Sequence, residues 1–185
     1  MSRVVFDLDS QKIVLDMFSE DLTEIKNNMK TVLTESIASQ VKIIGSLLSS
    51  STDRPYEKLE ETKIVSDELF YTVPNLGHGM DLNLAENCYQ IYFERYQGES
   101  LMRGHKKNQS DNIHTYLRSM WIDTVTLIGV NINSSIIEIV EELLAGQYKV
   151  EVVTDAIVNF EPIRIKGVKF MTTEEYVSMI RGEDD

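Results

Sequence analysis

The last third of the chain alternates short apolar runs with amphipathic segments, and this alternation constrains the fold more than any other feature of the sequence. Val125–Val130 (VTLIGV) has the composition of a strand that is buried on both faces. The next segment predicts a helix with five apolar residues on one side, namely Ile136, Ile137, Val140, Leu143 and Leu144. Gly146 ends this helix, and Lys149–Val153 predicts another strand. Strands that alternate with helices favour a parallel sheet covered on both faces, so we predict an α/β three-layer sandwich with a mainly parallel sheet.

Further elements are expected on either side of this region. One helix is indicated by four apolar residues on a common face, Ile113, Tyr116, Leu117 and Met120. At the C-terminal end, Val168–Phe170 predicts a short strand and Thr173–Arg181 a helix. Thr172 and Glu175 have the spacing of a capping box, in which the two side chains bond the free N–H groups at the start of a helix.

The first half of the chain has a weaker pattern. Lys12–Asp16 (KIVLD) predicts a buried strand whose final carboxylate emerges at an edge of the sheet. A helix should follow from Ser19 to a stop at Gly45, with Val32, Leu33, Ile37, Val41 and Ile44 at helical spacing. Ser46–Ser51 is a weak candidate for the second strand because of its serines, whereas Tyr89–Phe93 is aromatic and apolar enough for the third strand. Residues 54–87 show little hydrophobic periodicity. No repeat or linker divides the chain, so we expect one domain over residues 1–185.

The charge and cysteine content exclude several classes of protein. The chain has 18 Lys and Arg against 30 Asp and Glu, a net charge of −12, so its surface repels phosphate backbones and anionic membranes. No apolar run approaches the roughly 20 residues that a membrane-spanning helix needs. The single cysteine, Cys88, cannot form an internal disulfide, and residues 1–9 lack a leader pattern, so an intracellular, cytoplasmic location is expected by default.

Candidate site residues follow the predicted strands, because ligands of a parallel α/β sheet bind beyond the carboxyl ends of its strands. These candidates are Asp16, Arg95, residues 131–135 and Asp155. Three segments resemble the closing half of the isochorismatase-like cysteine hydrolases, namely G-V-N-I-N-S-S-I (Gly129–Ile136), V-V-T-D-A (Val152–Ala156) and G-V-K-F-M-T-T-E-E (Gly167–Glu175). The family's opening pattern is a strand ending in Asp, a helix, a Gly and a strand leading to Thr-x-x-Pro, which is similar to residues 12–55. The resemblance covers most of the chain.

The resemblance implies an activity and a set of site residues. In the family, a cysteine attacks a small amide or a related substrate, with an Asp as base and a Lys assisting. Asp16 matches the Asp, whereas Arg95 stands at the position of the Lys and Ser135 at that of the nucleophilic Cys. The family also has a strained cis peptide just before this helix, which would correspond to the bond between Val130 and Asn131.

The two substitutions weaken the chemistry that the resemblance implies. A thiol at a helix N-terminus can be shifted toward thiolate, whereas an alcohol needs a stronger base than a carboxylate, so Ser135 is a poor nucleophile. Arg95 keeps a positive charge but does not readily give up a proton, and it could pair with Asp16. We therefore predict a catalytically degenerate protein, without a cofactor, that serves as a structural or interaction subunit of a homo-oligomer or larger assembly. The expected interfaces are the apolar helix 136–144 and the aromatic stretch 89–96.

Two enzymatic alternatives stay open. The first is a hydrolase of a small amide or ester in which Ser135 is the nucleophile or Asp16 activates water, and Arg95 holds an anionic substrate. The second is a Mg²⁺-dependent phosphatase, because Val4–Ser10 (VVFDLDS) resembles the first motif of the haloacid-dehalogenase-type phosphatases, with Asp7 and Asp9 as nucleophile and acid. The second acidic motif of those enzymes should read Gly-Asp with another Asp four residues on, and the residues after Gly129 lack it, which argues against this alternative.

Structural roles compete with each of these functional ones. Asn133, Ser134 and Ser135 are good helix N-caps, and Asp155 could cap the segment that follows it. Cys88 has no adjacent histidine, so a buried and inert thiol is favoured over a nucleophile. No metal site is expected, because the three histidines lie far apart in the sequence, at His78, His105 and His114.

Overall fold

The computed structural model describes residues 2–10, 12–49, 89–96, 105–106, 113–132 and 134–183. The strands are β1 (Arg3–Leu8), β2 (Lys42–Ser49), β3 (Tyr89–Tyr96), β4 (His105–Lys106), β5 (Thr124–Val130), β6 (Lys149–Val158) and β7 (Val168–Met171). The helices are α1 (Lys12–Leu15), α2 (Thr23–Ala38), α5 (Ile113–Ser119), α6 (Ser135–Ala145) and α7 (Thr173–Arg181).

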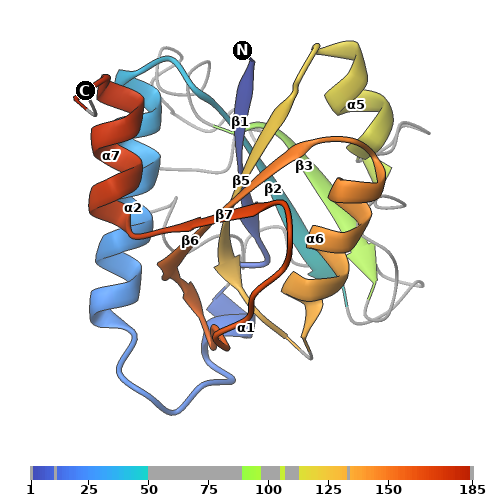
Figure 1. Cartoon of the computed structure of the whole chain (residues 1–185). Coiled ribbons are helices and arrows are strands. Elements are labelled where there is room, and N and C mark those ends of the chain that lie inside the picture. Colours follow the sequence, from blue (N-terminus) through green and yellow to red (C-terminus); the bar gives the residue numbers. More distant parts are fainter. Residues whose placement is uncertain are drawn as a thin grey trace, which may run out of the picture.

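The strands form one sheet of seven in the order β4-β3-β2-β1-β5-β6-β7 (Figure 1). Every neighbouring pair runs parallel except β3 and β4, which are antiparallel. The predicted α/β fold with a mainly parallel sheet is therefore confirmed. The order also shows that β1, the first strand of the chain, lies in the middle of the sheet.

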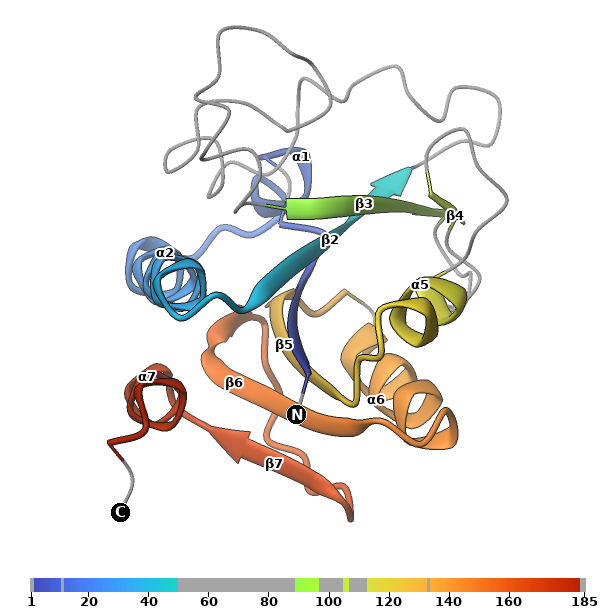
Figure 2. The ribbon, with the colours of Figure 1, turned by 90° about the horizontal axis from the view of Figure 1, so that it is seen from above.

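Helices cover both faces of the sheet and make three layers (Figure 2). On one face, α5 and α6 pack on residues such as Phe6 and Leu127, and their own apolar residues Ile113, Leu117, Ile136 and Leu143 are buried there. On the other face, α1, α2 and α7 pack on a second cluster that includes Val5, Ile128 and Val153. Successive residues of β1 alternate between these two cores, as the period of a strand requires.

The beginning of the chain differs from the prediction. Lys12–Asp16 is not a strand: Lys12–Leu15 forms the short helix α1, whose Val14 and Leu15 are buried, and Asp16 follows in an exposed turn. A short apolar run fits a buried strand and a buried helical turn equally well. The sequence pattern of Lys12–Asp16 alone therefore cannot distinguish the two. The first strand is Arg3–Leu8, which the phosphatase-like motif Val4–Ser10 overlaps.

The predicted helix from Ser19 to Gly45 is also too long. Helix α2 ends at Ala38, Gln40 adopts a left-handed conformation (φ 58°), and the following residues enter β2. Val41 and Ile44 happen to continue the helical spacing, although Ile44 is a buried strand residue. In the later part of the chain the strands at 125–130, 149–153 and 168–170 and the helices at 113–120 and 173–181 are confirmed within a few residues. None of the helices in the described ranges is long and apolar enough to cross a membrane.

Candidate functional site

The sheet has a topological switch point between β1 and β5. From β1 the chain continues through α2 to β2 on one side, and from β5 it continues through α6 to β6 on the other. In open parallel sheets the crevice beyond the carboxyl ends of two such strands is the usual place for a ligand. Asp7, Asp9, Asn131 and the N-terminus of α6 with Ser135 all lie at this edge.

Gly129 allows β1 and β5 to come close together there. Its φ is 121°, and a Cβ added to it would lie 2.2 Å from the carbonyl oxygen of Leu8 and 2.5 Å from the backbone nitrogen of Leu8. Any side chain would therefore overlap the backbone of β1. Glycine is therefore required at position 129, because β1 and β5 approach each other too closely there for a side chain.

Two buried carboxylates occupy the end of β1. Ser10 donates a hydrogen bond to both carboxylate oxygens of Asp7, over 2.6 and 2.7 Å, and Asp7 is only 1% exposed. Asp9 has a φ of 49°; its carboxylate accepts a hydrogen bond from the hydroxyl of Ser46 on β2 (2.6 Å), and its N–H donates to the same hydroxyl (3.1 Å). Serine hydroxyls thus hold both carboxylates in fixed orientations.

Asn131 organises the start of α6. Its side-chain oxygen accepts a hydrogen bond from the N–H of Ile136 (3.1 Å), and its side-chain amide donates to the carbonyl of Asn159 (3.0 Å). The side chain of Asn159 in turn donates to the carbonyl of Asn131 (3.2 Å). Ser134 stands at the N-cap with a left-handed backbone (φ 61°) and makes no capping hydrogen bond through its side chain. Capping by Ser134 was therefore the wrong prediction, and Asn131 performs this role.

Ser135 begins α6 and is 7% exposed. Its hydroxyl oxygen accepts a hydrogen bond from the N–H of Ile132 (3.1 Å), and its own N–H donates to the carbonyl of Ile132 (2.9 Å). Within the described ranges, no carboxylate or imidazole bonds this hydroxyl. The geometry fixes the Ser135 side chain without placing a base beside it. Val130 and Asn131, for which a cis bond was expected, are joined by a trans peptide, since the described backbone contains no cis bond.

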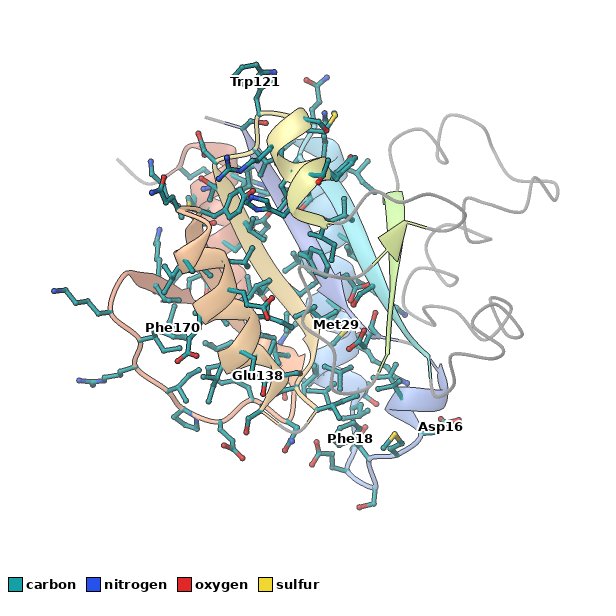
Figure 3. All side chains as sticks on the ribbon, turned by 90° about the vertical axis from the view of Figure 1, so that its right-hand side faces the viewer. Asp16, Phe18, Met29, Trp121, Glu138 and Phe170 are labelled. Atoms are coloured by element: carbon teal, nitrogen blue, oxygen red, sulfur yellow. The ribbon has the colours of Figure 1, made fainter. Side chains whose placement is uncertain are left out.

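The structure does not place Asp16 at the end of a strand. Its side chain is exposed on the turn after α1 and points outward (Figure 3). The first strand of the chain is β1, and the carboxylates at its end are those of Asp7 and Asp9. Their strand was missed because carboxylates are depleted in strands, although the alternation of Val4, Phe6 and Leu8 could have revealed it.

The other predicted residues lie on different elements. Arg95 is in β3, paired in register with Leu48 of β2, and its side chain is outside the described part. His114 packs edge-on against Tyr148 on the α5–α6 side, and Tyr148 has its pKa raised by burial. Cys88 and His78 lie outside the described residues, and Asn133 does as well. Among the described residues, no group of three or more His, Cys, Asp or Glu side chains could hold a metal ion.

Asp155 stabilises the start of a helix that is distant from it in the sequence. The pairing of β5 and β6 is irregular here, because Leu127 pairs with Val152 and Gly129 pairs with Ile157. Residues 153–156 of β6 therefore lie opposite the single residue Ile128 of β5 and form a bulge. On this bulge the carboxylate of Asp155 accepts hydrogen bonds from the N–H and the hydroxyl of Thr173 at the start of α7, each over 2.8 Å. The prediction that Asp155 caps the segment directly after it was therefore wrong, because its carboxylate bonds the first residue of α7 instead.

A cleft of about 640 Å³ opens beside this bulge. Glu24, Ile25 and Asn28 of α2 line one side of it, and Asp155, Asn159 and Phe160 line the other. Asn28 donates a hydrogen bond to the carbonyl of Asp155 (2.8 Å) across the cleft floor. Because Asn159 also bonds Asn131, the cleft wall is linked directly to the residue that caps α6.

No protein-family model and no curated protein sequence matches the chain. Solved structures do match it over nearly its whole length. An isochorismatase family protein from Burkholderia thailandensis superposes with a TM-score of 0.63 at 14% identity, covering 97% of this chain and 96% of its own. N-carbamoylsarcosine amidase from Thermoplasma acidophilum gives 0.60 at 15% identity, with 94% and 98% covered. The MAR1 ribonuclease from Caenorhabditis elegans gives 0.60 at 16% identity, with 100% and 83% covered. The chain therefore has the fold of the isochorismatase-like hydrolases.

Proposed function

We propose that the protein is a catalytically degenerate relative of the isochorismatase-like hydrolases and acts as a structural or interaction subunit. The observation that carries this proposal is the start of α6, where Ser135 stands in place of a cysteine and, among the described residues, bonds a backbone N–H and no base. A serine hydroxyl without a base is almost entirely protonated at neutral pH, and its nucleophilicity is correspondingly low. The buried carboxylates of Asp7 and Asp9 are already bonded to Ser10 and Ser46.

The absence of turnover is tested with a panel of small amides, esters and one generic phosphate monoester with Mg²⁺. Wild type, Ser135→Ala and Ser135→Cys are compared on every substrate. We expect wild type and Ser135→Ala to give the same background rate. A wild-type rate that falls in Ser135→Ala would contradict the proposal, and Mg²⁺-dependent release of phosphate that is lost in Asp7→Asn would support the phosphatase instead.

Most of the apolar residues of α6, the helix that was expected to form an interface, are buried within the protein itself. Ile136, Ile139, Val140 and Leu143 of α6 are between 0 and 3% exposed, because they face the core between α6 and the sheet. The surface that supports an interaction lies at the other end of β5 from Ser135. Trp121 lies just before this end of the strand and is 87% exposed (Figure 3). Tryptophan is enriched among the residues that dominate protein interfaces.

The backbone at Trp121 strengthens this argument. Trp121 adopts φ 56° at the end of α5, where Ile122 donates to the carbonyl of Leu117 and Trp121 donates to that of Arg118. This is the Schellman arrangement, whose left-handed residue is most stable as glycine. A residue other than glycine is strained in this conformation, and Trp121 also exposes 87% of its surface to water; burial of its ring in an interface would offset this cost.

The interaction role is tested by the native mass of the chain purified under mild conditions from its source, with all co-purifying chains identified. We expect a homo-oligomer or a stoichiometric partner in wild type and its loss in Trp121→Gly. Gln147→Gly is the matched control, because Gln147 (φ 66°) is exposed at the same position of the neighbouring helix α6. A monomer without a partner in wild type would contradict the proposal.

A working hydrolase is the second candidate, and the burial of Asp7 at the switch point favours it. In that case Asp7, rather than the exposed Asp16, would take a proton from the water that attacks the substrate carbonyl. Asp7→Asn would then abolish turnover, while Asp16→Asn would leave turnover unchanged. Equal rates in both variants would remove Asp7 from the mechanism.

A further inference from the structure

Two cationic side chains converge on the thioether of Met179 in α7. The Nη2 atom of Arg3 on β1 donates to Met179 Sδ over 3.6 Å, and the Nζ atom of Lys169 on β7 donates to the same sulfur over 3.4 Å. A thioether is a weak hydrogen-bond acceptor. Two strong donors therefore face an atom that satisfies them poorly.

Better acceptors near Arg3 are already engaged. The carboxylate of Glu151 accepts from Arg3 Nη2 through one oxygen (2.8 Å) and from the hydroxyl of Thr126 through the other (2.7 Å). The Nε atom of Arg3 is buried, and it has no hydrogen-bond partner. An unpaired buried donor is costly, so within the described structure Arg3 carries one N–H group that would be stabilised by a further acceptor.

We propose that Met179 is a site of oxidation, whose sulfoxide is stabilised by Arg3 and Lys169. Hydrogen peroxide is the oxidant: the sulfur attacks one peroxide oxygen, the O–O bond breaks, an S–O bond forms and water leaves. The sulfoxide oxygen is a strong acceptor at the place where the two cationic donors point. Oxidation here supplies the acceptor that the reduced protein lacks.

The surroundings of Met179 permit this change. Methionine sulfoxide usually disrupts a core because it places a polar oxygen among apolar groups. Met179 is only partly buried, at the margin of the core under α2 and α7, whereas Tyr176 is the residue of α7 that fills that core. Lys169 is exposed, so its side chain can move aside by the length of the new bond.

The first test measures where peroxide reacts in the folded protein. Sulfoxide formation is followed at each methionine by mass spectrometry of proteolytic peptides. Met17, which is 69% exposed, is the fast reference, and Met29, which is 1% exposed, is the slow one. We expect Met179 to oxidise at least ten times faster than Met29. A rate equal to that of Met29 would overturn the proposal.

The second test measures what the new acceptor does to stability, and it uses glutamine as a sulfoxide mimic. Met179→Gln and Met179→Leu are made in the wild-type and in the Lys169→Ala backgrounds, and the thermal midpoints of all four are compared. We expect Met179→Gln to unfold at the same temperature as Met179→Leu or higher, and this relative advantage to shrink in Lys169→Ala. A lower midpoint for Met179→Gln that is the same in both backgrounds would overturn the proposal.

Discussion

Gly129 is the residue on which the junction between β1 and β5 depends most. We expect Gly129→Ala to lower the free energy of unfolding by more than about 3 kcal/mol, because the new Cβ would meet the Leu8 backbone in a left-handed conformation. Urea denaturation measures the loss. Gly182→Ala is the control: Gly182 has φ 72° but no atom within 4 Å of the added Cβ, so only the conformational cost of about 1 kcal/mol applies. Equal losses in the two variants would refute the steric argument.

Tyr176 gives the protein a dependence on alkaline pH. Burial raises the pKa of Tyr176 to about 12, while its hydroxyl shares a hydrogen bond with Ser36 over 2.7 Å. The folded state thus favours the neutral phenol, and in the unfolded chain the pKa is about 10. This contribution to stability is complete below pH 10 and is lost as pH rises to 12. We expect the urea midpoint of wild type to fall over this interval more steeply than that of Tyr176→Phe. Parallel curves would contradict the assignment.

At the scale of elements, four helices end in the same way. A left-handed residue ends α2 (Gln40), α5 (Trp121), α6 (Gln147) and α7 (Gly182), and each end has the paired hydrogen bonds of a Schellman motif. Only α7 has the glycine that this position favours. We expect Gln40→Gly and Gln147→Gly each to raise the free energy of unfolding by about 0.5–1 kcal/mol. Thermal unfolding measures the gain, and Gln147→Ala, which should give none, is the control.

Prediction from sequence succeeded for elements whose signals are local. The capping box of Thr172 and Glu175 is present with both of its hydrogen bonds, and α5 lies on the face that its apolar spacing indicates. It failed for β1 because Asp7 and Asp9 are stabilised by serines, one of which, Ser46, is 37 residues away from Asp9. Ser135 lies at the start of α6, as its sequence position indicates, whereas Asp16 lies on an exposed turn and not at the end of a strand, since no local pattern reveals which strand is central.

At the scale of the whole molecule, the fold does not identify the chemistry. Proteins with this fold include an amidase and a ribonuclease, so the residues at the switch point decide the activity.

The net charge of −12 is a property of the entire chain as well. Because like charges repel one another in the compact state, we expect the thermal midpoint to rise between 10 and 500 mM NaCl, as screening increases. A midpoint that falls with NaCl would show that attractive ion pairs dominate.

The mutual hydrogen bonds of Asn131 and Asn159 have a dynamic consequence. Backbone pairing of β5 and β6 ends with Val130 and Val158, and the two asparagine side chains continue it by one more residue on each strand. Strand ends normally fray, and their amide hydrogens exchange with solvent within the dead time of most experiments. Because these two hydrogen bonds hold the strand ends together, we expect the backbone amide hydrogens there to exchange slowly with solvent, and a ligand at this edge would meet a surface that is already formed.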